Sequence, residues 1–184
     1  MKKVSREQVL SPEQYAAQRE TLRQQVLALK RPRRVHVGKY LTFLFETSET
    51  VLYQVQEMLR VEGRSGEQDV VHELQTYNEL LAGDGELSCT LLIEIDDPLQ
   101  RDIVLRKWVH LPAHIYLKDD AGTRTKAVFD ARQIGDERLS SVQYLKFPCG
   151  GCPPVAIGLD HPDLEIEISL DEAQRAAMAQ DIAR

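Results

Sequence analysis

The chain has 184 residues, of which 42% are hydrophobic and 28% charged, and its formal net charge is −6. These values are typical of one globular domain and exclude a fibrous or fully disordered chain. No stretch approaches the roughly 20 consecutive apolar residues of a membrane-spanning helix, and charged residues follow Met1 too soon for a secretory leader. We therefore expect one cytoplasmic domain over residues 1–184 that binds no membrane.

The charge is distributed unevenly along the chain. Residues 1–40 hold ten of the 23 basic residues and three of the 29 acidic ones, so this segment carries +7 and the remainder −13. The simplest interpretation is that residues 1–32 form a helical arm that packs on its own acidic body, or on a second copy. An acidic protein partner is the alternative. Nucleic-acid binding is the third and weakest interpretation, because the acidic remainder of the chain would repel an anionic polymer.

The basic segment 30–39 is the region we expect to contact such a protein partner, a second copy or, as the weakest alternative, nucleic acid. Its expected contact residues are Arg31, Arg33, Arg34 and Lys39. The segment lacks interleaved aromatic side chains on which bases stack.

The N-terminal part of the chain predicts a helix and a hairpin. Ser11 and Gln14 have the spacing of a capping box, which opens a helix that ends near Lys30. The alternating apolar residues that follow predict a hairpin over residues 35–46, with Gly38 in its turn. This arrangement places the basic segment between the helix and the first strand.

Two further helices are predicted over residues 48–62 and 67–82. Each has apolar residues at helical spacing, and Gly63 is a typical residue to end the first of them. The link between them is short and polar, so we expect an antiparallel pair that covers one face of a sheet.

The rest of the chain is rich in strands. They are predicted at residues 86–95, 114–118, 124–129, 142–147, 155–159 and 164–169. Asp97 and Pro98 open a helix whose inward residues are expected to be Leu99, Ile103, Val104 and Trp108. A capping box that starts at Ser169 is expected to open a final helix to about Ile182.

Because these strands come in hairpins, the predicted fold is α+β, with a mostly antiparallel sheet covered by the helix pair and the terminal helices.

The segment from Phe45 to Arg60 resembles a bacterial family known only as domain of unknown function 3501, and the run Tyr53–Leu59 is its most specific part. The opening Met1–Arg6, the basic stretch before Val35 and the late Ala156–Pro162 are also similar. The resemblance covers nearly the whole chain. It implies no activity, but the family is often encoded beside rubrerythrin-like and iron–sulfur oxidoreductase proteins. That association suggests a role in redox or oxidative-stress work.

Cys149 and Cys152 form a Cys-Gly-Gly-Cys motif that does not look like part of the family's pattern. The two-residue spacing lets both sulfur atoms bind one metal ion, such as zinc or iron, or close a disulfide. A thioredoxin-like site needs a helix N-terminus after the motif, whereas here two prolines and a strand follow. The simplest interpretation is a loop with free thiols, and no cofactor is predicted outright.

A carboxylate–histidine site is the other candidate for chemistry. Glu46 ends a strand, Glu57 lies off the apolar stripe of the next helix, and His161 lies in a turn. Together the three are candidate metal ligands or a general base. The simpler interpretation is that Glu57 lies on a solvated helix face and that His161 is a turn residue.

These alternatives lead to two hypotheses of different kinds. The first is a non-enzymatic binding or accessory protein that docks on a redox partner or on itself through residues 31–39. The second is a metal- or thiol-dependent enzyme that uses Cys149 and Cys152, or Glu46, Glu57 and His161.

Overall fold

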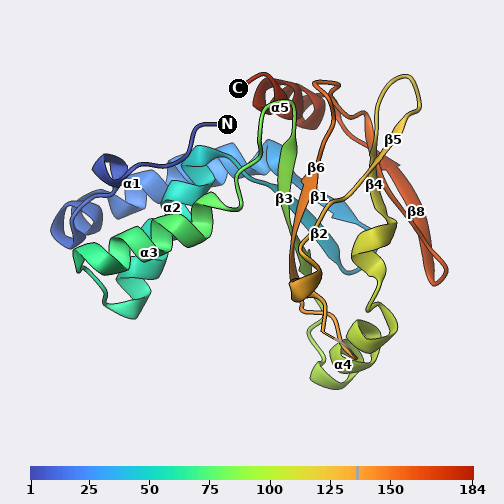
Figure 1. Ribbon diagram of the computed structural model, residues 1–184, viewed down its shortest axis with the longest axis horizontal. Coiled ribbons are helices and arrows are strands. Elements are labelled where there is room, and N and C mark those ends of the chain that lie inside the picture. The colour runs from blue at the N-terminus through green and yellow to red at the C-terminus, as the bar shows by residue number, and fades with distance from the viewer. Residues whose placement is uncertain (136) are drawn as a thin grey trace.

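The computed structural model describes residues 1–135 and 137–184 and has an α+β fold (Figure 1). The helices are α1 (Pro12–Lys30), α2 (Ser48–Glu62), α3 (Glu67–Asn78), α4 (Pro98–Lys107) and α5 (Glu172–Ile182). The strands are β1 (Arg34–Val37), β2 (Leu41–Phe45), β3 (Leu87–Ile93), β4 (Ile115–Lys118), β5 (Arg124–Lys126), β6 (Val142–Phe147), β7 (Ala156–His161) and β8 (Leu164–Ser169).

The strands form two sheets, where the sequence predicted one. The first sheet has the order β1-β2-β3-β6 and the second the order β5-β4-β7-β8, and every pairing is antiparallel. In the first sheet Leu44 lies opposite Thr90, and Thr90 lies opposite Tyr144. This register places side chains from β2, β3 and β6 in one row on the same face.

The main hydrophobic core lies between the two sheets. Phe43 and Leu91 of the first sheet and Ile157 and Leu159 of the second are fully buried in one cluster. Met178 of α5 belongs to the same cluster, and α5 and α4 lie at opposite ends of the sheets (Figure 1). Because side chains alternate along a strand, every second side chain of the first sheet points away from this core, toward the other face of the sheet.

Helices α1, α2 and α3 form a separate layer beside the first sheet (Figure 1). A second hydrophobic cluster in this layer joins α2 and α3 to the N-terminal segment, and it includes Val9, Val55, Leu59 and Val70. The predicted pairing of α2 with α3 is therefore present, and the pair buries its apolar residues within the helical layer.

The ends of the helices follow local capping chemistry. Ser11 and Gln14 form the predicted capping box of α1. Gly63 ends α2 with φ 64°, a left-handed conformation that glycine adopts without strain. At α5 the capping box is formed by Asp171 and Gln174, so the cap predicted at Ser169 lies two residues too early.

The predicted inward face of α4 was wrong in part. Leu99 is 79% exposed and Ile103 66%, whereas Leu105 is fully buried in the main core. Helix α3 also ends at Asn78 rather than near residue 82. None of the helices described here has the length and apolar character that crossing a bilayer requires.

Candidate functional site

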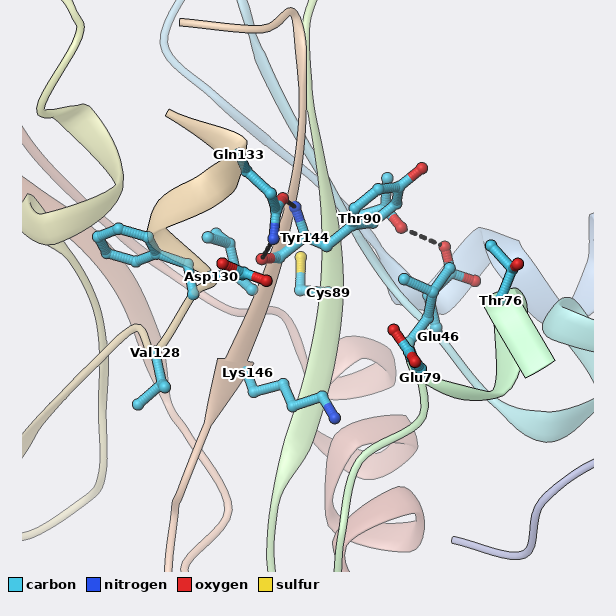
Figure 2. A pocket seen from close by; sticks show the side chains of 13 residues that line it. Glu46, Thr76, Glu79, Cys89, Thr90, Val128, Asp130, Gln133, Tyr144 and Lys146 are labelled. Atoms are coloured by element: carbon cyan, nitrogen blue, oxygen red, sulfur yellow. Dashed lines mark hydrogen bonds between the residues drawn. The ribbon is translucent and has the colours of Figure 1, made fainter. Parts of the chain in front are cut away.

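A groove of about 550 Å³ lies on the outward face of the first sheet, between the end of α3 and the chain that runs along β6 (Figure 2). We call it the Glu46 groove. It is lined by Glu46, Thr76, Glu79, Leu80, Cys89, Thr90, Val128, Phe129, Asp130, Gln133, Tyr144, Leu145 and Lys146. Its size is within the range of pockets that bind small molecules.

Glu46 is the half-buried carboxylate of this groove. It follows β2 directly, and its backbone N–H donates to the carbonyl oxygen of Ser88 at 3.0 Å. The hydroxyl of Thr90 donates to its Oε1 at 2.7 Å, and the hydroxyl of Thr50 donates to its Oε2 at 2.6 Å. Both oxygens are therefore oriented by neutral donors, and Glu46 makes no ion pair with any residue that the structure describes.

Tyr144 provides an aromatic ring beside this carboxylate. It lies opposite Thr90 across the strand pair and is 39% exposed. Burial raises the pKa of its hydroxyl, and Tyr77 and the Glu46 carboxylate raise it further. Gln133 accepts a hydrogen bond from the backbone N–H of Tyr144 at 2.8 Å, which holds the neighbouring chain against β6.

The charges around the groove are mainly negative. Glu79 at the end of α3 and Asp130 on the opposite side add two carboxylates to that of Glu46, and Lys146 is the basic residue among those that line it. Asp130 is already paired with Arg132. Figure 2 shows Lys146 extending toward the side on which Glu79 lies. The groove is therefore suited to a ligand that carries positive charge.

The predicted trio of Glu46, Glu57 and His161 is not brought together. Glu57 lies in the helical layer, where Arg19 donates to it from Nε at 2.7 Å and Tyr15 from its hydroxyl at 2.6 Å. These donors hold the pKa of Glu57 down at about 2, the Arg19 hydrogen bond being the main cause. Among residues 1–135 and 137–184, no group of three or more histidine, cysteine or acidic side chains is placed to hold a metal ion.

His161 lies at the end of β7 and is only 7% exposed. Its Nδ1 accepts a hydrogen bond from the backbone N–H of Asp163 at 3.2 Å, and its ring meets that of His114 edge-on with centroids 5.0 Å apart. Burial lowers the pKa of His161, and the nearby His114 lowers it further. The His161 side chain is therefore an uncharged hydrogen-bond acceptor at neutral pH, and it belongs to the last residue of β7 rather than to the turn that follows.

Cys149 and Cys152 lie in a tight turn and are both free thiols. The backbone N–H of Cys152 donates to the carbonyl oxygen of Cys149 at 3.0 Å, and Gly150 and Gly151 both have positive φ. Burial raises the pKa of Cys149 to about 11, so its thiol stays protonated at neutral pH. Zinc or iron at these thiols stays a prediction.

The basic segment does not act as one surface. Arg33 is buried and forms an ion pair with Asp181 of α5, with Nε and Oδ2 2.7 Å apart. Arg31, Arg34 and Lys39 are exposed. A partner that docks here would meet these three residues and not Arg33.

Sequence reasoning found Glu46 but missed the residues that make its surroundings. Thr90 lies on the face of its strand opposite to Cys89 and Leu91, and the alternation in the sequence shows this. The alternation does not show that Tyr144 lies beside Thr90 or that Glu79 lines the same groove. The pairing of β3 with β6 joins segments far apart in the chain.

A family model described as protein of unknown function (DUF3501) matches residues 3–182, and the chain therefore belongs to this family. A solved structure described as a novel protein of unknown function from Burkholderia pseudomallei K96243 is similar, with a TM-score of 0.90 and 30% sequence identity. The match covers 98% of this chain and 100% of that one. No curated protein matches the chain.

Proposed function

We propose that the protein is a non-enzymatic binding protein that holds a small organic cation, an ammonium compound, in the Glu46 groove. The observation that carries the proposal is the Glu46 carboxylate, which is half removed from water and has hydroxyl donors but no cationic partner among the described residues. Removing a carboxylate from water without an opposite charge is unfavourable. A bound ammonium group would supply that charge.

The neighbours of Glu46 support a cation of this kind. The face of a tyrosine ring attracts ammonium groups, and Tyr144 is partly exposed in the same groove. Glu79 adds negative charge on the same side of the groove as Glu46 (Figure 2). The two threonine hydroxyls orient the carboxylate before a ligand arrives, which lowers the cost of ordering the site.

The residues that line the groove include neither an activated thiol nor a carboxylate–histidine pair. Its thiol, Cys89, is buried, and burial raises the pKa of that thiol well above its ordinary range. The carboxylates around it have no histidine partner among the residues that line the groove. Binding without turnover is therefore the function that these side chains support best.

An accessory role toward a protein partner or a second copy remains part of the proposal. Arg31, Arg34 and Lys39 are exposed and are the residues that such a partner would meet. Neither the groove nor the comparisons support the expected link to redox work, and the proposal does not include it.

The test is a binding measurement by isothermal titration calorimetry with butylamine and tetramethylammonium, with butanol as the neutral control. We expect at least one cation to bind and butanol not to bind. In Glu46→Gln the carboxylate loses its charge and keeps an oxygen for the threonine hydroxyls, so cation affinity should fall at least about tenfold, which is about 1.4 kcal/mol.

The matched control is Glu20→Gln on α1, whose side chain is 70% exposed and outside the groove. It should leave cation binding unchanged. Absence of binding by both cations to the unmodified protein, or equal affinity in Glu46→Gln, would overturn the proposal.

A further inference from the structure

A second pocket lies in the helical layer, away from the Glu46 groove. Its volume is about 440 Å³, and it is formed where the start of α1 meets α2 and the loop before α3. Leu10, Leu59 and Val70 provide apolar surface in it, and the last two belong to the buried cluster of the helices. The pocket therefore has an apolar floor that extends to the core of this layer.

Three arginines surround this apolar floor. Arg6, Arg60 and Arg64 all line the pocket, and Glu13 is the acidic residue among those that line it. The three arginine side chains are between 42% and 49% exposed. The protein as a whole is acidic, whereas the residues that line this pocket include three basic groups and one acidic group. The glutamates that pair with the arginines lie outside the lining.

Each of the three arginines is only partly used by its glutamate partner. Arg60 donates to Glu57 from Nη2 at 3.0 Å, and Nη1 of Arg64 lies 3.0 Å from Glu62. Arg6 donates to Glu67 from Nε at 2.9 Å. A guanidinium group has five N–H donors in a planar fork, so further donors remain on each side chain. The acidic partners hold the arginines in place without exhausting their hydrogen-bonding capacity.

The start of α1 adds no formal charge to the pocket, only the partial positive charge of a helix N-terminus. Ser11 accepts from the backbone N–H of Gln14, and Gln14 accepts from that of Ser11, so the cap is internally satisfied. The positive character of the pocket therefore comes mainly from the guanidinium groups.

We infer that this arginine pocket binds an amphipathic anion, which is a carboxylate or phosphate monoester carried on a short apolar chain. The anionic head would be bound by the free N–H groups of Arg60 and Arg64, because charge-assisted hydrogen bonds to arginine are among the strongest in proteins. The apolar chain would cover Leu10, Leu59 and Val70. This site and its ligand are independent of the Glu46 groove.

The test uses isothermal titration calorimetry of the full chain with four probes, namely octanoate, hexyl phosphate, inorganic phosphate and hexanol. We expect octanoate or hexyl phosphate to bind at least about tenfold more tightly than inorganic phosphate or hexanol. Binding of octanoate alone assigns a carboxylate head and binding of hexyl phosphate alone a phosphate head. If neither binds, the inference is overturned.

Two variants test the place of binding by different means. Arg60→Gln with Arg64→Gln removes two charges and should weaken the amphipathic anion at least about tenfold. Ala16 lines the pocket and is exposed on α1, so Ala16→Leu fills the pocket without changing charge and should weaken binding as well. Leucine is a good helix former, so α1 should remain intact.

The matched control is Arg106→Gln on α4. Arg106 is 51% exposed, which is close to the exposure of the pocket arginines, and it is paired with an acid four residues away. Helix α4 lies far from the helical layer that contains the pocket (Figure 1). It should bind the anion like the unmodified protein, and so should Glu46→Gln. Unchanged affinity in both the double arginine variant and Ala16→Leu would overturn the inference even if the anion binds.

Discussion

At the scale of single residues, Glu46 and Glu57 are two carboxylates in neighbouring segments that have different hydrogen-bond partners. Glu57 is bound by Arg19, Arg60 and Tyr15, and its side chain is 17% exposed. Glu46 is bound by threonine hydroxyls alone. Glu57 is therefore part of the joint between α1 and α2, whereas the Glu46 carboxylate has no ion-pair partner among the described residues.

The pKa of Glu57 makes the stability of that joint depend on pH. Its folded pKa is about 2, below the ordinary value of 4.5, so the ionised form is favoured by folding. Its contribution is fully present above about pH 4.5 and is lost as pH falls toward 2. We expect Glu57→Gln to be less stable than the unmodified protein at neutral pH, and the difference in the free energy of unfolding to shrink between pH 4.5 and 2.

Urea unfolding followed by circular dichroism over this pH range measures the difference. Glu20→Gln, at an exposed position of α1, is the control and should show no such pH dependence. A difference for Glu57→Gln that stays constant down to pH 2 would contradict the role of its ionised form.

At the scale of elements, α4 shows that the apolar residues of a helix do not always face the core. Leu99 and Ile103 lie on its exposed side, and Leu105 is the residue that enters the main cluster. Arg106 pairs with Asp102 on the same surface. The helix is therefore held by one buried leucine, its Asp97 cap and the residues that follow it.

This arrangement predicts opposite effects for substitutions within one helix. Leu105→Ala should lower the free energy of unfolding by about 2–5 kcal/mol, because it leaves a cavity in the core. Leu99→Gln and Ile103→Gln should each change it by about 0.5 kcal/mol or less. Chemical denaturation measures all three, and a loss at Leu99 as large as that at Leu105 would show that α4 is packed differently.

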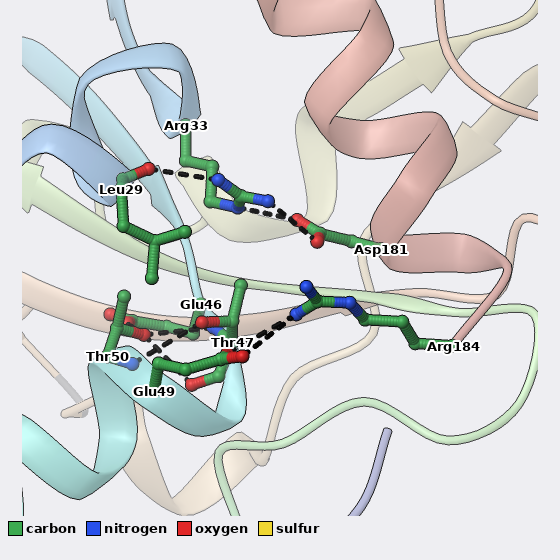
Figure 3. Close-up of polar contacts among 8 residues, drawn as sticks. All are labelled: Leu29, Arg33, Glu46, Thr47, Glu49, Thr50, Asp181 and Arg184. Carbon is green, nitrogen blue, oxygen red and sulfur yellow. Dashed lines mark hydrogen bonds and ion pairs between the residues drawn. The ribbon is translucent and has the colours of Figure 1, made fainter. Parts of the chain in front are cut away.

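At the scale of the whole molecule, a buried ion pair joins the segment between α1 and β1 to the last helix, α5. Arg33, just before β1, and Asp181 of α5 are 4% and 0% exposed, and Arg33 also donates to the carbonyl oxygen of Leu29 at 2.9 Å (Figure 3). Nearby, Arg184 pairs with Glu49 at the start of α2. The helical layer, the first sheet and α5 are thus tied together at one place.

Removing one partner of this pair should lower the free energy of unfolding, because the charge of the other partner then stays buried without an opposite charge. We expect Arg33→Ala to lower the free energy of unfolding by about 3–5 kcal/mol. Arg33→Met with Asp181→Leu should recover much of that loss, since two apolar side chains leave no buried charge.

The exposed pair in the same region is the control, and Arg184→Ala should cost about 1 kcal/mol or less. Urea unfolding measures these variants. A double variant as unstable as Arg33→Ala would show that the loss comes from packing and not from the uncompensated charge of Asp181.

The sequence by itself determined the elements and the ends of several of them. Ser11 caps a helix, Gly63 ends one and Gly38 lies in a hairpin turn, and each does so through contacts with near neighbours in the sequence. The spacing of apolar residues within ten or twenty positions distinguishes strands from helices. For the same reason the α+β class and the antiparallel hairpins were predictable. The family resemblance was confirmed as well.

Only the tertiary structure decided which surfaces these elements share. It divided the strands between two sheets, brought Thr90 to Glu46 across 44 residues and placed Arg33 against Asp181 across 148. It also turned Leu99 and Ile103 outward, although their spacing is that of an inward face. Local chemistry depends on near neighbours, whereas these contacts depend on how the layers pack on one another. The Glu46 groove lies on the first sheet beside the end of α3, and the arginine pocket lies within the helical layer, so both are products of tertiary packing.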